Sequence, residues 1–371
     1  IKVMSGVLKS DSVVYNVKKE KTERIAQLFL IKGKQQINTT QLMTGDIGAV
    51  AKLVVTETND TLATKENPFI LPTIQFPSPM LSMAVLPKTK GDEEKISSGL
   101  TRLMDEDPTF KVELNPETKQ TLIYGIGDQH LDLILSKLKA KFKVEVELTN
   151  PRIPYRETIR KKVKVEGKHK KQSGGHGQFG DIWVEFEPGP TEDLVFEEKI
   201  FGGAVPKQYF PAVEKGLRES ITKGVLAGYP VVNLKATLVD GKYHPVDSSE
   251  MAFKIAASLA YKEGVQQAGP VLLEPISHVE VLVPDSYMGD IIGDMNKRRG
   301  RILGMNPAVG GMQQVVAEVP EAEMFKYATD LRSMTQARGS YTIRFERYEE
   351  APQNVAEKVI AEAKKDKEAE E

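Results

Sequence analysis

Lysines, glycines and hydrogen-bonding side chains follow one another in one short segment of this chain. The segment consists of Lys170, Lys171, Gln172, Ser173, Gly174, Gly175, His176 and Gly177, which we call the candidate loop. The lysines carry positive charge, the glutamine and serine both donate and accept hydrogen bonds, and the glycines let another backbone approach closely. This mixture suits contact with the phosphates, 2′-hydroxyl groups and unstacked bases of RNA. An exposed hairpin with solvated lysines has the same composition, so both interpretations stay open at this point.

Enzymatic chemistry has less support. Ser173 has no evident base beside it to activate it. The chain has no cysteine, which excludes disulfides, zinc-thiolate sites and a cysteine nucleophile. It also lacks the G-x-x-x-x-G-K-[ST] phosphate loop, the G-x-S-x-G elbow and the H-E-x-x-H metal helix. A metal-dependent enzyme built on His169, His176 and His244 is the alternative from another class, but no Asp, Glu or Cys completes a typical zinc spacing. We therefore predict no catalytic residue and no metal site.

A second polar segment, residues 240–247, joins a predicted strand to a predicted helix. It carries His244 beside an aromatic residue and near a lysine; alternatively, His244 and Pro245 only shape the entry to the helix. Asp247 can cap this helix, and Glu250, three residues on, can close a capping box. The helical spacing of apolar residues predicts that the buried face consists of Met251, Ile255, Leu259 and Ala260. If both loops lie at one end of a domain, they form a polar tip.

A third segment is a basic cluster that ends a predicted helix and begins a strand. It contains Lys297, Arg298, Arg299 and Arg301. Cations near a helix C-terminus complement its dipole, but three arginines within five residues exceed that need, and arginine suits phosphate recognition. We predict an RNA or acidic-protein contact here. The formal net charge of the chain is −1, yet residues 161–171 hold six lysines against one glutamate, so the charge is segregated locally.

The hydrophobic pattern of the 371 residues predicts a multidomain α+β protein. Residues 1–74 alternate short strands with turns, including one strand over residues 23–30, and predict a small β-barrel. Residues 75–151 and residues 276–350 each follow the order β-α-β-β-α-β, which is the ferredoxin-like split βαβ pattern. The first residues read as a strand without a start methionine, so we expect the chain to be a piece of a longer protein.

The two remaining parts differ from this pattern. Residues 152–275 form another α+β unit, in which a helix follows Pro206 and Pro211 predicts a kink or restart. Residues 351–371 are a charged tail, either a solvated helix or disordered. No run of about 18 apolar residues occurs, so no membrane span is predicted.

Several motifs resemble bacterial elongation factor G, and they occur in the order of that family. They are K-H-K-K-Q-S-G-G-H-G-Q-F-G at residues 168–180, H-P-V-D-S-S-E-M-A-F-K at 244–254, Y-M-G-D at 287–290 with N-K-R-R-G at 296–300, A-T-D-L-R-S-M-T-Q at 328–336 with R-G-S-Y at 338–341, P-K-T-K at 87–90 and G-D-Q-H-L-D at 127–132. The resemblance covers residues 1–350.

The resemblance implies domains two to five of a ribosomal translocase, with the barrel truncated at its start and a fourth domain like ribosomal protein S5. It implies that GTP and magnesium bind a GTPase domain that this chain lacks, so we expect no cofactor and no enzymatic activity here. The expected partners are the ribosome, with ribosomal, transfer and messenger RNA in the decoding region, and the stalk base of the large subunit. We expect a cytoplasmic monomer that contacts no membrane.

The resemblance also assigns site residues. The candidate loop and His244 would contact the decoding region, and the basic cluster would lie near the large subunit. His176 stands where arginine is common in the family, and Pro245 where an acidic residue is common. These departures suggest a divergent paralogue. The alternatives are a ribosome-recycling or ribosomal-protection factor of the same superfamily and a structural scaffold.

Overall fold

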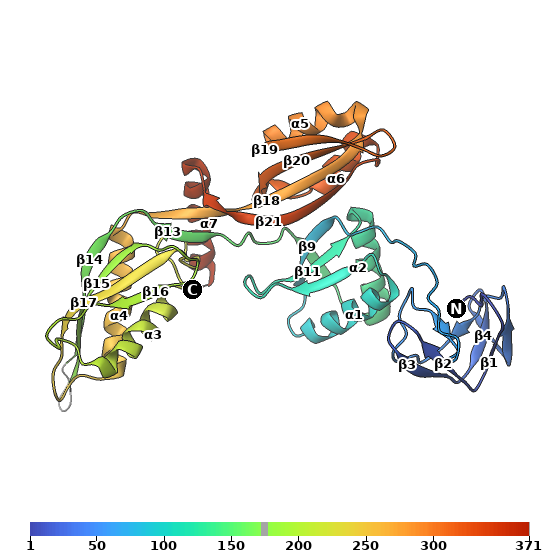
Figure 1. Ribbon diagram of the computed structural model, residues 1–371, viewed down its shortest axis with the longest axis horizontal. Helices are drawn as coiled ribbons and strands as arrows, with labels where there is room; N and C mark the ends of the chain where they lie inside the picture. Colours follow the sequence, from blue (N-terminus) through green and yellow to red (C-terminus); the bar gives the residue numbers. More distant parts are fainter. Residues whose placement is uncertain (172–176, 371) are drawn as a thin grey trace. The chain divides into compact units, whose positions relative to one another are not determined.

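The computed structural model describes residues 1–171 and 177–370. The chain divides into two compact units, Ile1–Leu114 with Thr121–Thr149 and Asn115–Gln120 with Asn150–Glu371. The structure confirms a multidomain α+β chain with several separate sheets (Figure 1).

Short strands dominate the N-terminal part of the first unit. They are β1 (Val7–Lys9), β2 (Ser12–Asn16), β3 (Lys21–Ile25), β4 (Leu28–Lys32), β5 (Gln35–Thr39), β6 (Gln41–Met43), β7 (Ala49–Val50) and β8 (Leu62–Ala63). They pair as three small sheets, β1-β6, β3-β2-β8 and β5-β4-β7. The single strand predicted over residues 23–30 is wrong, because β3 ends at Ile25 and β4 begins at Leu28. Both residues are buried in one core, and residues three apart in a continuous strand would face opposite sides.

The second part of this unit confirms the predicted split βαβ order. Its elements are β9 (Leu81–Pro87), α1 (Glu93–Glu106), β10 (Lys111–Leu114), β11 (Thr121–Gly125), α2 (Asp128–Phe142) and β12 (Val146–Thr149). The sheet order is β10-β11-β9-β12. Leucines and isoleucines at helical spacing on α1 and α2 are buried, as expected for helices that cover one face of a sheet.

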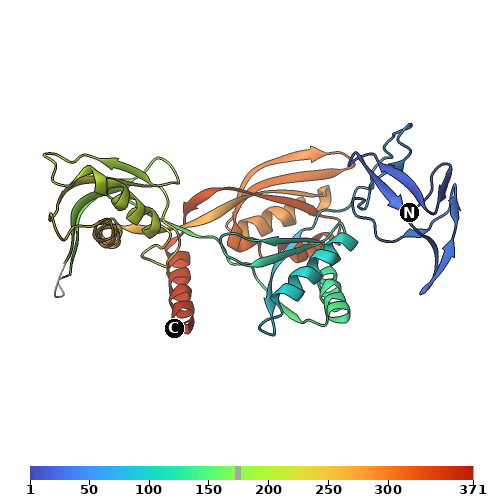
Figure 2. The ribbon, with the colours of Figure 1, turned by 90° about the horizontal axis from the view of Figure 1, so that it is seen from below.

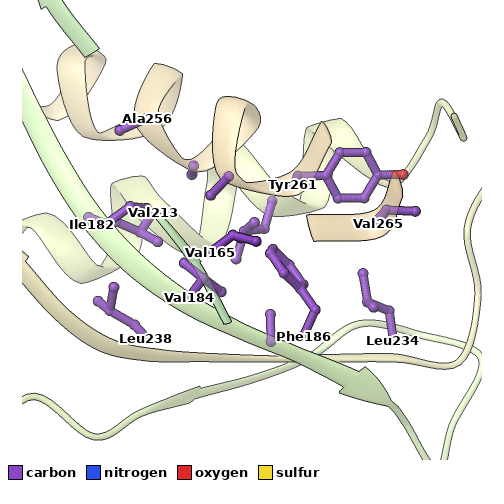
Figure 3. Close-up of a cluster of buried hydrophobic side chains, with 14 of the residues drawn as sticks. Val165, Ile182, Val184, Phe186, Val213, Leu234, Leu238, Ala256, Tyr261 and Val265 are labelled. Carbon is purple, nitrogen blue, oxygen red and sulfur yellow. The ribbon is translucent and has the colours of Figure 1, made fainter. Parts of the chain in front are cut away.

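In the second unit, a four-stranded sheet carries the candidate loop. Its elements are β14 (Val163–Lys171), β15 (Gln178–Pro188), β16 (Val195–Glu198), the 3-10 helix η1 (Lys207–Tyr209), α3 (Phe210–Ser220), β17 (Leu234–Lys242) and α4 (Glu250–Gln267). The sheet order is β14-β15-β17-β16, and only β16 and β17 run parallel. Side chains from the sheet and from α4 meet in the core (Figure 3). The predicted restart is confirmed, since η1 follows Pro206 and α3 begins at Phe210 with Pro211 in its first turn.

The predicted buried face of α4 is largely wrong. Ala260 is buried, but Met251 is 59% exposed and Leu259 is 42% exposed. The reason lies in β14 and β15, where a Cβ added to Gly167 would lie 2.2 Å from the Ala256 carbonyl oxygen. The helix therefore packs directly on strand backbone, and only small residues fit at that contact.

The predicted cap of α4 is also wrong. The N-cap residue is Ser249, whose side chain accepts a hydrogen bond from the Ala252 N–H at 3.2 Å. The Asp247 carboxylate instead accepts a hydrogen bond from the Gly177 N–H at 2.9 Å. Asp247 thus connects two loops. Ser249, an equally good capping residue, caps the helix in its place.

In the rest of the second unit, residues 270–350 repeat the split βαβ order, as predicted for residues 276–350. Its elements are β13 (Arg156–Ile159), β18 (Pro270–Pro284), η2 (Asp285–Tyr287), α5 (Met288–Lys297), β19 (Arg301–Ala308), β20 (Met312–Pro320), η3 (Glu321–Met324), α6 (Tyr327–Thr335), β21 (Ser340–Glu350) and α7 (Gln353–Glu370). The sheet order is β13-β18-β20-β19, and β21 also pairs with β18.

Within the tail, for which a helix and disorder were both open, Gln353–Glu370 form the continuous helix α7 (Figure 2). Val359 is buried with Ile153, Tyr155 and Leu272. The first half of the helix is therefore packed rather than fully solvated.

Candidate nucleic-acid interface

Lys170 and Lys171 of the candidate loop lie at the distal end of the β14–β15 hairpin, which is the end where β14 finishes and β15 begins. The strands pair in register from Val163 opposite Phe186 to Lys171 opposite Gln178. Lys170 and Lys171 are the last residues of β14 and both are exposed. Neither forms an ion pair within residues 1–171 and 177–370. The predicted contacts Gln172, Ser173, Gly174, Gly175 and His176 lie outside the described residues.

The second polar segment lies against the start of β15. The Phe179 N–H donates to the Asp247 carbonyl oxygen at 2.8 Å, and the Ser248 hydroxyl donates to the Phe179 carbonyl oxygen at 2.9 Å. Together with the bond from Gly177 to Asp247, these contacts join both loops at one end of the sheet. This is the juxtaposition on which the sequence argument for a polar tip depended.

His244 is held in place by this segment. Its Nδ1 accepts hydrogen bonds from the Val246 and Asp247 N–H groups at 3.3 and 3.2 Å. An Asp247 carboxylate oxygen lies 3.3 Å from the same nitrogen, but Nδ1 cannot donate to it while accepting from backbone N–H groups. The ring also packs edge-on against Phe179, with centroids 6.4 Å apart. His244 is exposed, so Nε2 is the nitrogen left to meet a ligand.

A row of side chains across the sheet adds Lys242, the lysine of the second polar segment, which was not among the predicted contacts. Asp181 lies opposite Lys168 on β14 and opposite Lys242 on β17. The Lys168 ammonium lies 3.0 Å from the buried Asp181 carboxylate, and this contact raises the pKa of Lys168. Lys242 is exposed and without an ion pair in the described part of the chain. Only the strand register shows that Lys242 lies at the same end as the candidate loop.

The basic cluster is largely internal. Arg298, whose side chain is 13% exposed, donates to Asp294 at 2.8 Å, to Asp330 at 2.5 Å and to the Glu323 carbonyl oxygen at 2.6 Å. Its guanidinium also lies over the Tyr327 ring, 4.9 Å from the centroid. Because these partners occupy its donors, Arg298 has little capacity left for an external phosphate.

Arg299 is also paired internally. It donates two hydrogen bonds of 2.8 Å to Glu274 and one of 2.9 Å to Glu323. Arg301 is paired with Glu318 at 2.6 Å, but its side chain is 68% exposed. Lys297 is exposed on the last turn of α5. Within this cluster, Lys297 and Arg301 are therefore the side chains that remain accessible to a ligand.

The pairing of Glu318 predicts an acid-sensitive contact. Hydrogen bonds from Arg347 first and Arg301 second lower the pKa of Glu318 to about 2, against the opposing effect of burial. The stability from this pairing is present above the ordinary carboxyl pKa and is lost as pH falls through about 2. Glu318→Gln is expected to lower the free energy of unfolding by about 2 kcal/mol at pH 6. The difference in this free energy between the variant and the original protein should narrow between pH 5 and pH 2. Urea unfolding of both proteins across this range measures the difference, and a difference that stays constant would contradict the prediction.

The described residues contain neither a metal-binding cluster nor a helix that could span a membrane. Within residues 1–171 and 177–370, no group of three or more His, Asp or Glu side chains is arranged to hold a metal ion. No helix among them has both the length and the apolarity needed to span a bilayer. His169, one of the three histidines in the metal alternative, has its Nε2 2.8 Å from the Gln178 side-chain oxygen.

Comparison with protein families identifies all four folded parts. Elongation factor G domain 2 matches residues 1–65, domain III matches residues 76–150, domain IV matches residues 151–269 and the elongation factor G C-terminus matches residues 271–359. A GTPase domain is not among these matches.

A solved structure supports the same relationship. The crystal structure of a protein from Thermus thermophilus is similar over 97% of this chain, with 39% sequence identity and a TM-score of 0.81. The alignment covers 54% of that protein, so the chain spans about half of its length. The four domain matches and this similarity show that the chain belongs to the elongation factor G family and carries its domains II to V.

Proposed function

We propose that this chain is the ribosome-binding part of a GTP-dependent translation elongation factor that promotes translocation of transfer RNA and messenger RNA. In this proposal the distal end of the β14–β15 sheet enters the decoding region. One observation carries the proposal: the hydrogen bonds of Asp247 and Ser248 bring both predicted RNA-contacting segments together at one end of the sheet. GTP and magnesium would bind another part of the parent protein, which would act in the cytoplasm as a monomer.

The charges at this end fit an RNA ligand. Lys170, Lys171 and Lys242 are exposed, and they have no carboxylate partner among the described residues. Ammonium groups without an internal partner are free to replace the counterions that surround RNA phosphates. His244 offers an imidazole that is positioned by hydrogen bonds from the Val246 and Asp247 N–H groups. Binding that depends on such contacts weakens as the salt concentration rises.

The test is a triple variant, Lys170→Ala, Lys171→Ala and Lys242→Ala, in ribosome-binding titrations at several salt concentrations. We expect binding to weaken roughly ten- to a hundredfold and the salt dependence to become shallower, by about one unit of log–log slope per lysine that contacts a phosphate. The matched control is Lys215→Ala, Lys223→Ala and Lys262→Ala. These lysines are exposed on or beside α3 and α4 of the same domain, so the charge removed is equal.

Equal losses in the two triple variants would contradict the proposal, because binding would then depend on total charge alone. Translocation itself is tested with the parent protein that includes a GTPase domain. Movement of transfer RNA and messenger RNA should be slowed by the first triple variant and not by the control. Splitting of ribosomes without any translocation would instead favour a recycling factor.

A further inference from the structure

The loop between β16 and η1 exposes an aromatic ring completely to solvent. Its sequence over residues 199–206 is K-I-F-G-G-A-V-P, and Phe201 is 94% exposed. Gly202 and Gly203 follow with φ of +66° and +71°, a backbone conformation that favours glycine. The two glycines turn the chain directly after the ring. Phe201 thus contributes nothing to the core of this domain.

Both ends of the loop are fixed at the same end of the sheet as the candidate interface. On entering the loop, the Lys199 N–H donates to the Leu238 carbonyl oxygen at 2.8 Å. At its exit, Val205 is buried against Gly241, where an added Cβ would lie 2.5 Å from the valine side chain. Gly241 precedes Lys242, the last residue of β17. Phe201 is therefore carried on a short turn whose two ends are bound to the distal half of β17.

A third contact joins the element that follows the loop to the segment that carries His244. The Tyr209 hydroxyl donates to the Ser248 carbonyl oxygen at 3.4 Å, and the Tyr209 ring stacks on Phe253 of α4 with centroids 4.6 Å apart. The loop over residues 199–206 thus lies at the end of the sheet that also carries Lys170, Lys171 and the segment at residues 240–247.

The chemistry of the loop fits an unpaired nucleotide. A phenyl ring offers its face to any base, and stacking of this kind needs no sequence-specific hydrogen bond. Two glycines without side chains leave room for a sugar–phosphate backbone beside the ring. Lys207 and Gln208 at the start of η1 are exposed and can reach a phosphate or a hydroxyl group. A protein-binding anchor would be expected within a wider apolar patch. Phe201 is instead followed by two glycines, and Ile200 before it packs against the core of this domain.

We propose that Phe201 is an RNA contact and that its ring stacks on an unpaired base when the distal end of this domain meets the ribosome. The proposal rests on the proposed function, because it takes ribosomal, transfer or messenger RNA as the ligand. It adds a contact from a segment that is separate in sequence from both predicted loops.

The first test compares Phe201→Leu with Phe201→Tyr in ribosome binding. Leucine keeps an apolar side chain but has no ring, so binding should weaken about tenfold, which corresponds to about 1.4 kcal/mol. Tyrosine keeps the ring, so binding should stay within about twofold of the original. Phe69→Leu is the matched control, since Phe69 is also an exposed phenylalanine. Equal binding by the leucine and tyrosine variants of Phe201 would overturn the proposal.

The second test identifies the ligand. Photoreactive benzoylphenylalanine replaces Phe201, the chain is bound to ribosomes, and cross-linked nucleotides are mapped by primer extension. Cross-linking to an unpaired nucleotide is the expected result. Cross-linking to a ribosomal protein alone, or no cross-link from a chain that still binds, overturns the role of Phe201 but leaves the proposed function standing. A chain that binds no ribosomes even with Phe201 intact overturns both.

Discussion

Arg299→Ala is expected to destabilise the C-terminal sheet by about 3–5 kcal/mol, the range found when one partner of a buried ion pair is removed. Its partner Glu274 is only 4% exposed in its side chain and receives two hydrogen bonds of 2.8 Å from Arg299. Within residues 1–171 and 177–370, Arg299 is the cation that pairs with this carboxylate, which would stay buried on β18 without it. Hydrogen bonding to Glu274 also raises the pKa of Arg299, because the same pairing stabilises the charged guanidinium.

Two further variants make this prediction specific. Arg299→Lys keeps the positive charge but not the planar guanidinium group. Its loss of stability should therefore lie between zero and the loss in Arg299→Ala. Arg301→Ala is the control, because Arg301 is mostly exposed and its partner Glu318 keeps two hydrogen bonds from Arg347. The control should lose less than about 1 kcal/mol.

The measurement is hydrogen exchange of the amides in β18 and β20, because a chain of several domains need not unfold in one step. Exchange in these strands should accelerate most in Arg299→Ala. The same acceleration in Arg301→Ala would show that the pairing of Arg299 with Glu274 is not what stabilises these strands. The conclusion that Arg299 is used inside the domain would then be wrong.

Gly167→Ala is expected to cost about 3 kcal/mol, at the upper end of the usual penalty for overpacking a core. The added Cβ would lie 2.2 Å from the Ala256 carbonyl oxygen and 2.6 Å from the Ala260 side chain. The first of these atoms belongs to helix backbone, so it cannot move aside by changing a rotamer. The whole of α4 would have to shift away from β14, and Ser249 at its start would shift with it.

The only tryptophan of the chain provides the measurement. Trp183 lies opposite Glu166 in the hairpin, next in register to Gly167, so its emission during urea unfolding reports on this sheet. Gly304→Ala is the matched control. Gly304 is also in a strand, β19, and an added Cβ there meets no atom within 4 Å. A similar loss of stability in both variants would show that α4 does not rest on the backbone at Gly167.

The sequence alone determined the fold class and the β-α-β-β-α-β order within residues 75–151 and 276–350. Such an order is readable because the periods of helices and strands depend only on neighbours along the chain. The motifs of the candidate loop and of residues 244–254 could also be recognised from the sequence, because each is a continuous run of residues. They led to the family that the domain matches later showed.

Tertiary structure decided which side chains are available. The hydrogen bond from Gly177 to Asp247 joins residues 70 positions apart, and it removes Asp247 from the cap that local spacing predicted. Gly167 selects the alanine face of α4 over the face with Met251 and Leu259. Glu274 and Glu323 occupy Arg299, although sequence composition favoured an external contact.

These outcomes share one physical cause. Local periodicity records which residues could be buried or charged, but a partner that is distant in sequence decides which of them are. The same holds for Phe201, since no pattern in residues 199–206 distinguishes an exposed ring from a buried one. Only the attachment of its loop to Leu238 and Gly241 brings that ring to the end of the sheet where His244 and the exposed lysines lie.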